Sequence, residues 1–225
     1  MSEDAEGAIT AKLSKGITIT LGLSWFEILG EIWKIGRKLM QGMANEGMYE
    51  VLDYESTLEL FDAKGKKAAF KKKMKVRYLQ DETIAFQDFA WGDGEILLDY
   101  KTKPGWEVDQ HRSGYKTYIL ISLREVKNRG SIDDYKITWG IRNGFLTKDG
   151  YWSTEISHKM KQGRVNIVFP QSRAPHRVFL EENNRRRAMI LDEKYWKKLS
   201  DGRWQITWKV DKPKLYENYI IRWVW

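Results

Sequence analysis

The feature that most constrains this chain is a change of hydrophobic period at residues 45–47. From there on, apolar side chains alternate with polar ones instead of recurring at helical spacing. Residues 73–78 (KMKVRY) alternate basic and apolar side chains, which is typical of a strand with one solvated face. Many short strands separated by turns favour a β-sandwich or barrel. We therefore predict a mainly β domain, a β-sandwich of short antiparallel strands, over residues 47–225.

Glycine-containing turn signals divide this region into segments. They are Lys64-Gly65, Asp93-Gly94, Pro104-Gly105, Ser113-Gly114, Asn143-Gly144, Asp149-Gly150, Gln162-Gly163 and Asp201-Gly202. The strands that we predict between them include residues 115–123, 135–141, 151–157, 164–169, 177–182, 187–191, 203–210 and 219–225. Residues 192–199 are predicted to form one short helix near the C-terminus, capped by Asp192. The C-terminal segment YIIRWVW is so apolar that we expect it to pair in a sheet and to be buried on one face.

The N-terminal region carries a different pattern. Residues 1–16 are predicted to be a flexible tail, and residues 17–46 an amphipathic helical segment with apolar side chains at alternating spacings of 4 and 3. Several glycines weaken this helix by about 1 kcal/mol each, so we expect it to gain order by docking. The side chains predicted to bind a partner are Leu21, Trp25, Ile28, Ile32, Trp33, Ile35 and Leu39. Packing on the chain's own sandwich and insertion into a membrane interface are the alternatives.

The stretch FQDFAWGDGEILLDY (residues 86–100) concentrates aromatic, acidic and glycine residues. The favoured interpretation is a hairpin-like turn at Asp93-Gly94, with Trp91 packed beneath it. The alternatives are a recognition loop formed by Trp91, Asp93 and Glu95, and a calcium site formed by clustered carboxylates. The spacing does not match an EF-hand, and we predict no metal site.

Two basic runs are candidates for contact with nucleic acid or lipid. Residues 64–75 (KGKKAAFKKKMK) surround Phe70, and the second run is residues 185–187. The candidate contact residues are Lys71, Lys72, Lys73, Arg185, Arg186 and Arg187. The favoured alternative for the first run is a hairpin whose exposed edge is protected by lysines against pairing with other chains.

No catalytic motif is present. The chain has no Cys, and its three His lie in no paired metal-ligand spacing. The fingerprints of P-loop, Rossmann and G-x-S-x-G enzymes are absent. We therefore predict no catalytic residues, no cofactor and no enzymatic activity. An unfamiliar enzyme with a site near Asp93, Glu95 and His111 stays an alternative.

The net charge and the N-terminal residues indicate where in the cell the protein is expected. The formal net charge of +8 combines 39 basic with 31 acidic residues, which indicates a mixed, solvated surface. The N-terminal residues MSEDAEG are acidic where a secretory signal is basic. No early apolar run is long enough to span a bilayer. We expect a soluble, cytoplasmic protein.

Four segments carry a resemblance: VRYLQDETIAFQDFAWGDGEILLDY, YKTYILISLREVKNRG, ITWGIRNGFL and YENYIIRWVW. Over about residues 50–225 the chain resembles a poorly characterised bacterial β-sandwich family found in conflict and antiviral-defence loci. The resemblance implies an accessory subunit beside a protease, NTPase or CRISPR-type effector. We expect an adaptor, regulator or protease target of such a complex, binding a larger protein of the same system through the N-terminal helix. Membrane contact through that helix is the alternative, and nucleic acid is a less favoured partner.

Overall fold

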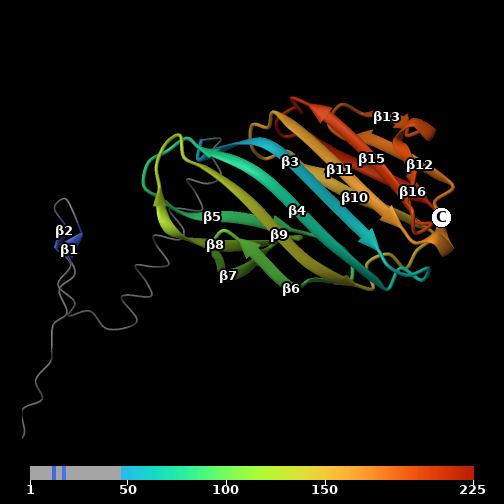
Figure 1. The fold of residues 1–225 in the computed structure, drawn as a ribbon, viewed down its shortest axis with the longest axis horizontal. Helices are drawn as coiled ribbons and strands as arrows, with labels where there is room; N and C mark the ends of the chain where they lie inside the picture. The colour runs from blue at the N-terminus through green and yellow to red at the C-terminus, as the bar shows by residue number, and fades with distance from the viewer. Residues whose placement is uncertain (1–11, 14–16, 19–46) are drawn as a thin grey trace, which may run out of the picture. The chain divides into compact units, whose positions relative to one another are not determined.

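The computed structural model describes residues 12–13, 17–18 and 47–225 of the chain (Figure 1). The chain divides into two units, Met1–Asn45 and Glu46–Trp225. In the first unit, β1 (Lys12–Leu13) and β2 (Ile17–Thr18) form an antiparallel pair. The start of the predicted helical segment is thus a strand. All the predicted partner-binding side chains of that segment lie outside the described residues.

The second unit is built on a seven-stranded sheet. In spatial order its strands are β14 (Trp196–Lys198), β15 (Trp204–Asp211), β11 (Gln162–Phe169), β3 (Tyr49–Leu60), β4 (Lys67–Tyr78), β9 (Ile132–Arg142) and β6 (Glu95–Lys103). Neighbouring strands are antiparallel except β11 and β3, which run parallel. The prediction of a mainly β domain is confirmed, although this parallel pair was not expected, and several strands are longer than predicted.

Two smaller sheets complete the unit. The three-stranded sheet has the order β5 (Thr83–Ala90), β8 (Lys116–Lys127), β7 (Trp106–Ser113). The four-stranded sheet has the order β10 (Asp149–Glu155), β16 (Asn218–Val224), β12 (Arg177–Glu182), β13 (Arg187–Ile190). The C-terminal strand β16 lies inside its sheet, and Trp223 is fully buried, as the apolar C-terminus predicted.

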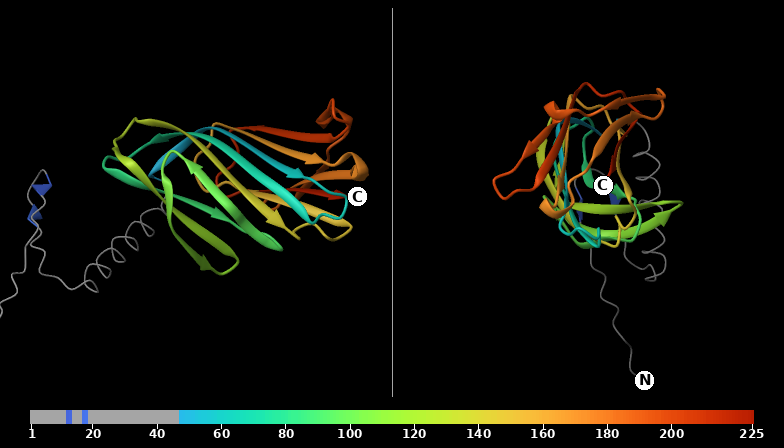
Figure 2. Two further views of the ribbon diagram at one scale, coloured as in Figure 1. Left: turned by 60° about the horizontal axis from the view of Figure 1, so that its bottom comes forward. Right: turned by 90° about the vertical axis from the view of Figure 1, so that its right-hand side faces the viewer.

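Both smaller sheets cover the same face of the large one. Phe86 of β5 stacks on Tyr135 of β9 with ring centroids 4.2 Å apart, and Tyr219 of β16 lies 4.7 Å from Trp208 of β15. The strand register places Tyr135 and Trp208 on one face of the seven-stranded sheet. The unit therefore has two layers, of which the second is divided into two sheets (Figures 1 and 2).

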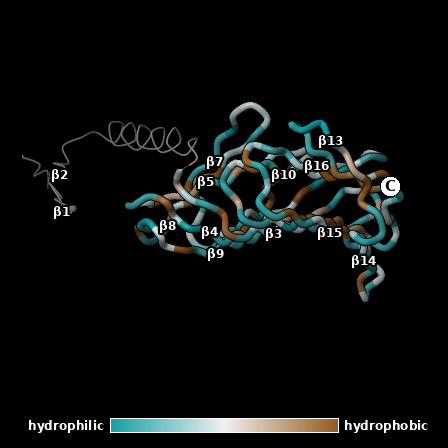
Figure 3. The backbone as a smooth tube through the Cα atoms, turned by 90° about the horizontal axis from the view of Figure 1, so that it is seen from above, coloured by the Kyte–Doolittle hydropathy of each residue, from teal (hydrophilic) through white to brown (hydrophobic). Residues whose placement is uncertain are grey.

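Strand β4 shows how the sequence specifies this arrangement. Its even-numbered residues from Ala68 to Tyr78 are buried between the layers, whereas Lys71, Lys73 and Lys75 face solvent. Hydrophilic and hydrophobic residues are interspersed along the backbone of the unit (Figure 3). However, β4 lies between β3 and β9 rather than at an edge. The prediction that its lysines protect a sheet edge is therefore wrong.

The short C-terminal helix predicted over residues 192–199 is also wrong. A 3₁₀ turn, Glu193–Tyr195, is followed directly by β14, and Asp192 makes no capping hydrogen bond through its side chain. Trp196 explains the difference: it pairs with β15, and its indole N–H donates to the carbonyl oxygen of Leu191 at 2.7 Å. Within the described residues, no helix is long and apolar enough to cross a membrane.

Two predicted turns belong to strands instead. Asp149-Gly150 begins β10, and Gln162-Gly163 begins β11. At position 150 a Cβ atom would lie 2.4 Å from the indole ring of Trp223. Gly150 is therefore required by close packing between strands and not by the turn that the sequence pattern indicated.

Candidate functional site

The stretch 86–100 connects two different sheets. Strand β5 before the turn pairs with β8, whereas β6 after it pairs with β9. Gly94 adopts a positive φ of 73° within the turn, and a Cβ there would lie 2.3 Å from the carbonyl oxygen of Arg142. The predicted turn is present, but it is not a hairpin. It carries the chain from the three-stranded sheet to the seven-stranded sheet.

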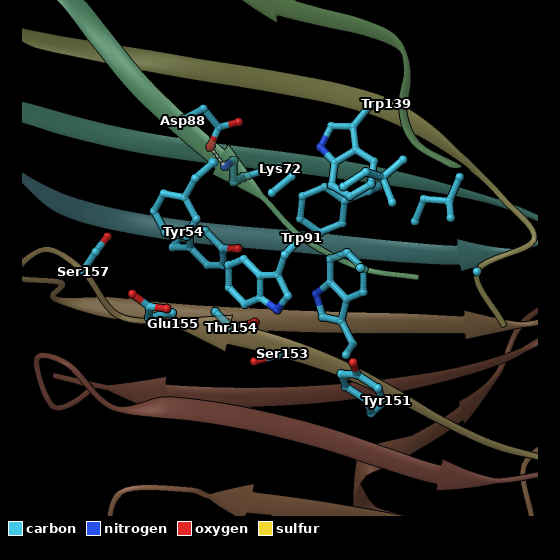
Figure 4. A pocket seen from close by; sticks show the side chains of 18 of the residues that line it. Tyr54, Lys72, Asp88, Trp91, Trp139, Tyr151, Ser153, Thr154, Glu155 and Ser157 are labelled. Carbon is cyan, nitrogen blue, oxygen red and sulfur yellow. Dashed lines mark hydrogen bonds and ion pairs between the residues drawn. The ribbon is translucent and has the colours of Figure 1, made fainter. Parts of the chain in front are cut away.

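A cavity of about 140 Å³, open to solvent on one side, lies beside this turn between the two layers. Strands β3, β4 and β9 of the large sheet contribute to its walls, together with β5 and β10 of the smaller sheets (Figure 4). Its lining is rich in aromatic side chains, among them Tyr54, Phe70, Phe89, Trp91, Trp139 and Trp152. Phe70 lies 4.9 Å from Trp139 and 4.8 Å from Trp152, between ring centroids.

The cavity lies where the second layer is divided. Strand β5 is the end strand of the three-stranded sheet, and β10 is the end strand of the four-stranded sheet. Residues 86–90 of β5 and all of β10 line the cavity. Across the described part of the chain, neither strand has a pairing partner on its second edge. Two incomplete sheet edges therefore border one aromatic cavity.

A buried ion pair forms one wall. The ammonium of Lys72 on β4 donates to the carboxylate of Asp88 on β5, and both residues are buried (Figure 4). The hydroxyl of Tyr100 donates to the other oxygen of Asp88 at 3.1 Å. Burial and the negative charge of Asp88 raise the pKa of Tyr100, so it is a neutral donor. Burial raises the pKa of Tyr54 in the same wall to about 12. The charges in this wall compensate one another.

His158 lies in the lining after β10. Its ring stacks on Tyr49 with centroids 4.1 Å apart, and its Nδ1 atom lies 2.9 Å from the hydroxyl of Ser157. Burial lowers the pKa of His158 to about 4, so the ring is neutral at pH 7.

A second ion pair joins the two smaller sheets. The ammonium of Lys116 on β8 lies 2.6 Å from the carboxylate of Glu155 on β10. It also lies 5.0 Å from the ring centroid of Phe89 and 5.3 Å from that of Trp91. Burial alone would lower the pKa of Lys116, but the hydrogen bond and the charge of Glu155 hold that pKa above its ordinary value. Lys116 is therefore charged where it meets the cavity lining.

The structure separates the residues that the sequence grouped near the turn. Trp91 and Asp93 line the cavity, but Glu95 forms an ion pair with Arg142 at 2.9 Å. His111 lies on β7, stacked on Tyr118 at 5.3 Å, and is not part of the lining. The proposed enzyme site near Asp93, Glu95 and His111 is thus not assembled around this cavity. Among the described residues, no three His, Asp or Glu side chains form a metal-binding group.

The basic candidates are also divided. Lys71 and Lys73 are exposed, but Lys72 points into the interior and cannot contact an external polyanion. Arg185 lies 3.2 Å from Glu182 and 3.7 Å from the buried carboxylate of Glu217, so its charge is partly neutralised. Arg186 and Arg187 are exposed at the β12–β13 turn.

Sequence reasoning missed the opposite wall of the cavity. It predicted the strand that carries Trp152, Ser153 and Glu155 but gave no reason to place it beside β5. The two strands are far apart in the chain and do not pair with each other, so no local pattern links them. The one indication in the sequence was that Trp91, Trp139 and Trp152 are bulky aromatic residues on segments predicted to form the same β domain.

Comparison with known proteins gives no family. No family model matches the chain, and no curated protein matches it. Among solved structures, it is similar to a candidate protease from Parabacteroides distasonis ATCC 8503, at 10% identity and a TM-score of 0.49. That match covers 79% of this chain and 40% of the other. An M1 zinc metallopeptidase from Deinococcus radiodurans matches at 9% identity and a TM-score of 0.41, over 78% of this chain and 42% of the other. The chain spans less than half of either protein, and likeness at this level carries no argument about activity.

Proposed function

We propose that residues 46–225 form a non-enzymatic recognition module, which binds an extended segment of a partner protein and accepts one apolar side chain of that segment in the cavity. One observation carries the proposal. An aromatic-lined cavity lies between the end strands β5 and β10, whose second edges have no pairing partner in the described part of the chain.

The size of the cavity defines the bound group. Its volume of about 140 Å³ is close to that of an engineered apolar cavity that binds benzene, about 150 Å³. Sites for cofactors or drug-sized ligands are larger, about 300 Å³ or more. One aromatic ring or one branched aliphatic side chain therefore fits.

The two free edges define the form of the partner. A strand edge presents unpaired backbone N–H and C=O groups, and an extended peptide can add to it as a further strand. Main-chain hydrogen bonds then give affinity, and a pocket beside the edge selects alternate side chains. Strand β10 is the favoured edge, because Tyr151 and Asp149 on it are exposed whereas Asp88 and Ala90 on β5 are buried.

The electrostatics favour an uncharged anchor. Lys72 is neutralised by Asp88, Lys116 is paired with Glu155, and His158 is neutral at pH 7. The lining carboxylates without an ion pair in the described residues, Asp93 and Asp149, are exposed. A charged side chain in the buried part of the cavity would therefore lose its hydration without gaining a counter-charge there.

Hydrolytic chemistry is the competing function, because Ser157 and His158 are within hydrogen-bond distance. A general base works best with a pKa near the operating pH, and a pKa of about 4 makes His158 a poor base. Among the described residues, no carboxylate hydrogen-bonds to His158 to orient it. A binding role therefore agrees better with this pair.

A partner in an antiviral-defence complex, docked through the N-terminal helix, stays a prediction from the sequence. The described residues bear on neither part of it. The cavity adds a second contact surface to that prediction.

The test uses blocked nine-residue peptides that share a threonine-rich, extended background and differ in the central residue: Trp, Phe, Leu, Ala or Glu. Amide chemical shifts of the full-length, ¹⁵N-labelled protein report binding. We expect the Phe or Trp peptide to bind roughly 10- to 100-fold more tightly than the Ala peptide, with shifts in β5 and β10. Equal binding of all peptides, or shifts confined to other strands, would contradict the proposal.

A further inference from the structure

The outer face of the seven-stranded sheet, opposite the cavity, carries a cluster of lysines. We call the cluster the lysine face. It consists of Lys71 and Lys73 on β4, Lys136 on β9, and Lys101 and Lys103 on β6. All five are exposed. These three strands run side by side in the sheet (Figure 1).

The register sets like charges directly opposite one another. Lys73 pairs with Lys136 across β4 and β9, and Lys136 pairs with Lys103 across β9 and β6. Like charges directly opposite in a sheet are destabilising. The fold therefore maintains a row of three ammonium groups against their mutual repulsion.

No ion pair in the described residues neutralises this row, and Asp134, the acid on the same face of β9, lies opposite Lys75 in the register. In the part of the chain that the structure describes, Lys71 is the one member of the lysine face with an ion pair, at 3.7 Å from Glu59. Glu55 lies opposite Lys73 in the register, but its carboxylate is 3.5 Å from Arg164 on the other side. The row Lys73–Lys136–Lys103 is thus available to an external anion.

We propose that the lysine face binds the surface of an anionic phospholipid membrane. Neighbouring strands lie about 4.8 Å apart and alternate residues about 6.8 Å apart, so the ammonium groups of the lysine face are presented together on one side of the sheet. Clusters of lysines attract anionic leaflets without fixed geometry. The binding would be electrostatic and reversible.

The composition of the face favours lipid over nucleic acid. All five residues are Lys, whereas Arg is preferred for nucleic-acid contacts that need bidentate geometry. Single-stranded nucleic acid also needs aromatic rings between the basic residues. Here Thr138 lies between Lys71 and Lys101, and the residues that flank the cluster on β4 and β9, Ala69 and Gly140, are small.

This surface is separate from the cavity. Lys72 lies between Lys71 and Lys73 in β4 but points to the opposite side of the sheet, where it meets Asp88. The proposal therefore does not depend on peptide recognition, and the two can fail independently.

The test is flotation of the full-length protein with vesicles of phosphatidylcholine alone or with 30% phosphatidylserine. The variant combines Lys73→Gln, Lys103→Gln and Lys136→Gln. The control combines Lys148→Gln, Lys212→Gln and Lys214→Gln, which removes the same charge from exposed lysines outside the strands of the seven-stranded sheet. Both variants keep the N-terminal segment, so binding through that segment contributes equally to all three proteins. A 20-base-pair DNA duplex is titrated in parallel.

We expect the wild-type protein and the control to bind vesicles that contain phosphatidylserine, and added salt to release them. The lysine-face variant should bind roughly 100-fold more weakly, from about 1 kcal/mol per Lys. Vesicle binding that is absent, or equal in the variant and the control, overturns the proposal. Binding to the duplex and not to vesicles also overturns it, because the partner is then nucleic acid. Circular dichroism melting verifies that all three proteins are folded.

Discussion

The ammonium of Lys116 lies 2.6 Å from the carboxylate of Glu155, and this contact joins the two sheets that form the divided second layer. Lys116 belongs to the three-stranded sheet and Glu155 to the four-stranded sheet. The edges of β5 and β10 border the cavity beside this contact. We infer that the ion pair helps to fix the spacing between the two free edges.

A double-mutant cycle tests the strength of this link. Lys116→Met and Glu155→Gln should each lower the free energy of unfolding. The double variant should lose less free energy of unfolding than the sum of the two single losses. We expect a coupling free energy of about 1 kcal/mol, the upper end for exposed pairs, because both side chains are largely shielded from solvent. Urea unfolding measures it. Additive single effects would show that the contact does not stabilise the fold.

Substitution in the buried pair of Lys72 and Asp88 should destabilise the protein more than substitution in the pair of Lys116 and Glu155. Asp88→Asn keeps the shape of the side chain but leaves the Lys72 ammonium buried without its counter-charge. We expect a loss of about 3–5 kcal/mol in the free energy of unfolding. The double variant Lys72→Met with Asp88→Leu should recover most of this loss, because two apolar groups need no compensation. If the double variant is as unstable as Asp88→Asn, the cause is lost packing rather than uncompensated charge.

Filling the cavity should weaken peptide binding. Ala90 is buried and lines the cavity from β5, so Ala90→Leu places three further carbon atoms in the space for the anchor side chain. We expect affinity for the Phe peptide to fall at least about tenfold. Ala188→Leu makes the same change at an exposed position on β13 and should leave binding unchanged. Unchanged affinity in Ala90→Leu would place the anchor elsewhere.

His158 should make stability depend on pH. Its pKa is about 4 in the folded protein and 6.5 ordinarily, so between these values the unfolded chain binds a proton that the folded chain does not. This contribution is fully present above pH 6.5 and decreases as the pH falls towards 4, by about 3 kcal/mol in total. His158→Phe retains a ring against Tyr49 and should lack this component. Parallel pH profiles for the two proteins would be incompatible with the depressed pKa.

The lysine row predicts a variant that is more stable than the wild type. Lys136 lies between Lys73 and Lys103, so Lys136→Gln should raise the free energy of unfolding by about 0.2–1 kcal/mol. Lys75 lies between Asp53 and Asp134 in the same sheet, and Lys75→Gln should lower it by a similar amount. Urea midpoints at low salt compare the two. A loss of stability in both variants would mean that repulsion in the row is negligible.

Much of the fold follows from local pattern. The alternation in β4 identified a strand correctly, because one face of it is buried, and the apolar segment that became β8 was correctly predicted as a strand inside a sheet. Residues 192–199 show the limit of this reasoning. A helix capped by Asp192 was predicted there, but pairing of Trp196 with Ile206 in β15 determined the structure. Such pairing depends on residues that are distant in sequence.

The site was only partly predictable for the same reason. The turn at Asp93-Gly94, with Trp91 beside it, could be predicted from composition and spacing. The partners across the cavity could not. Lys72 appeared to belong to an exposed basic run, and its burial against Asp88 depends on how β5 packs over β4. The lysine face likewise combines three strands whose order in the sheet no local pattern gives.

Hydrogen exchange of the backbone amides, with and without the Phe peptide, tests the central claim most directly. If an extended peptide adds to β10, alternate amides of Asp149–Glu155 should exchange about tenfold more slowly in the complex, and Ala90→Leu should abolish this protection. If the peptide binds but no amide of β10 or β5 gains protection, the free edges are not its binding site and the proposed function is wrong.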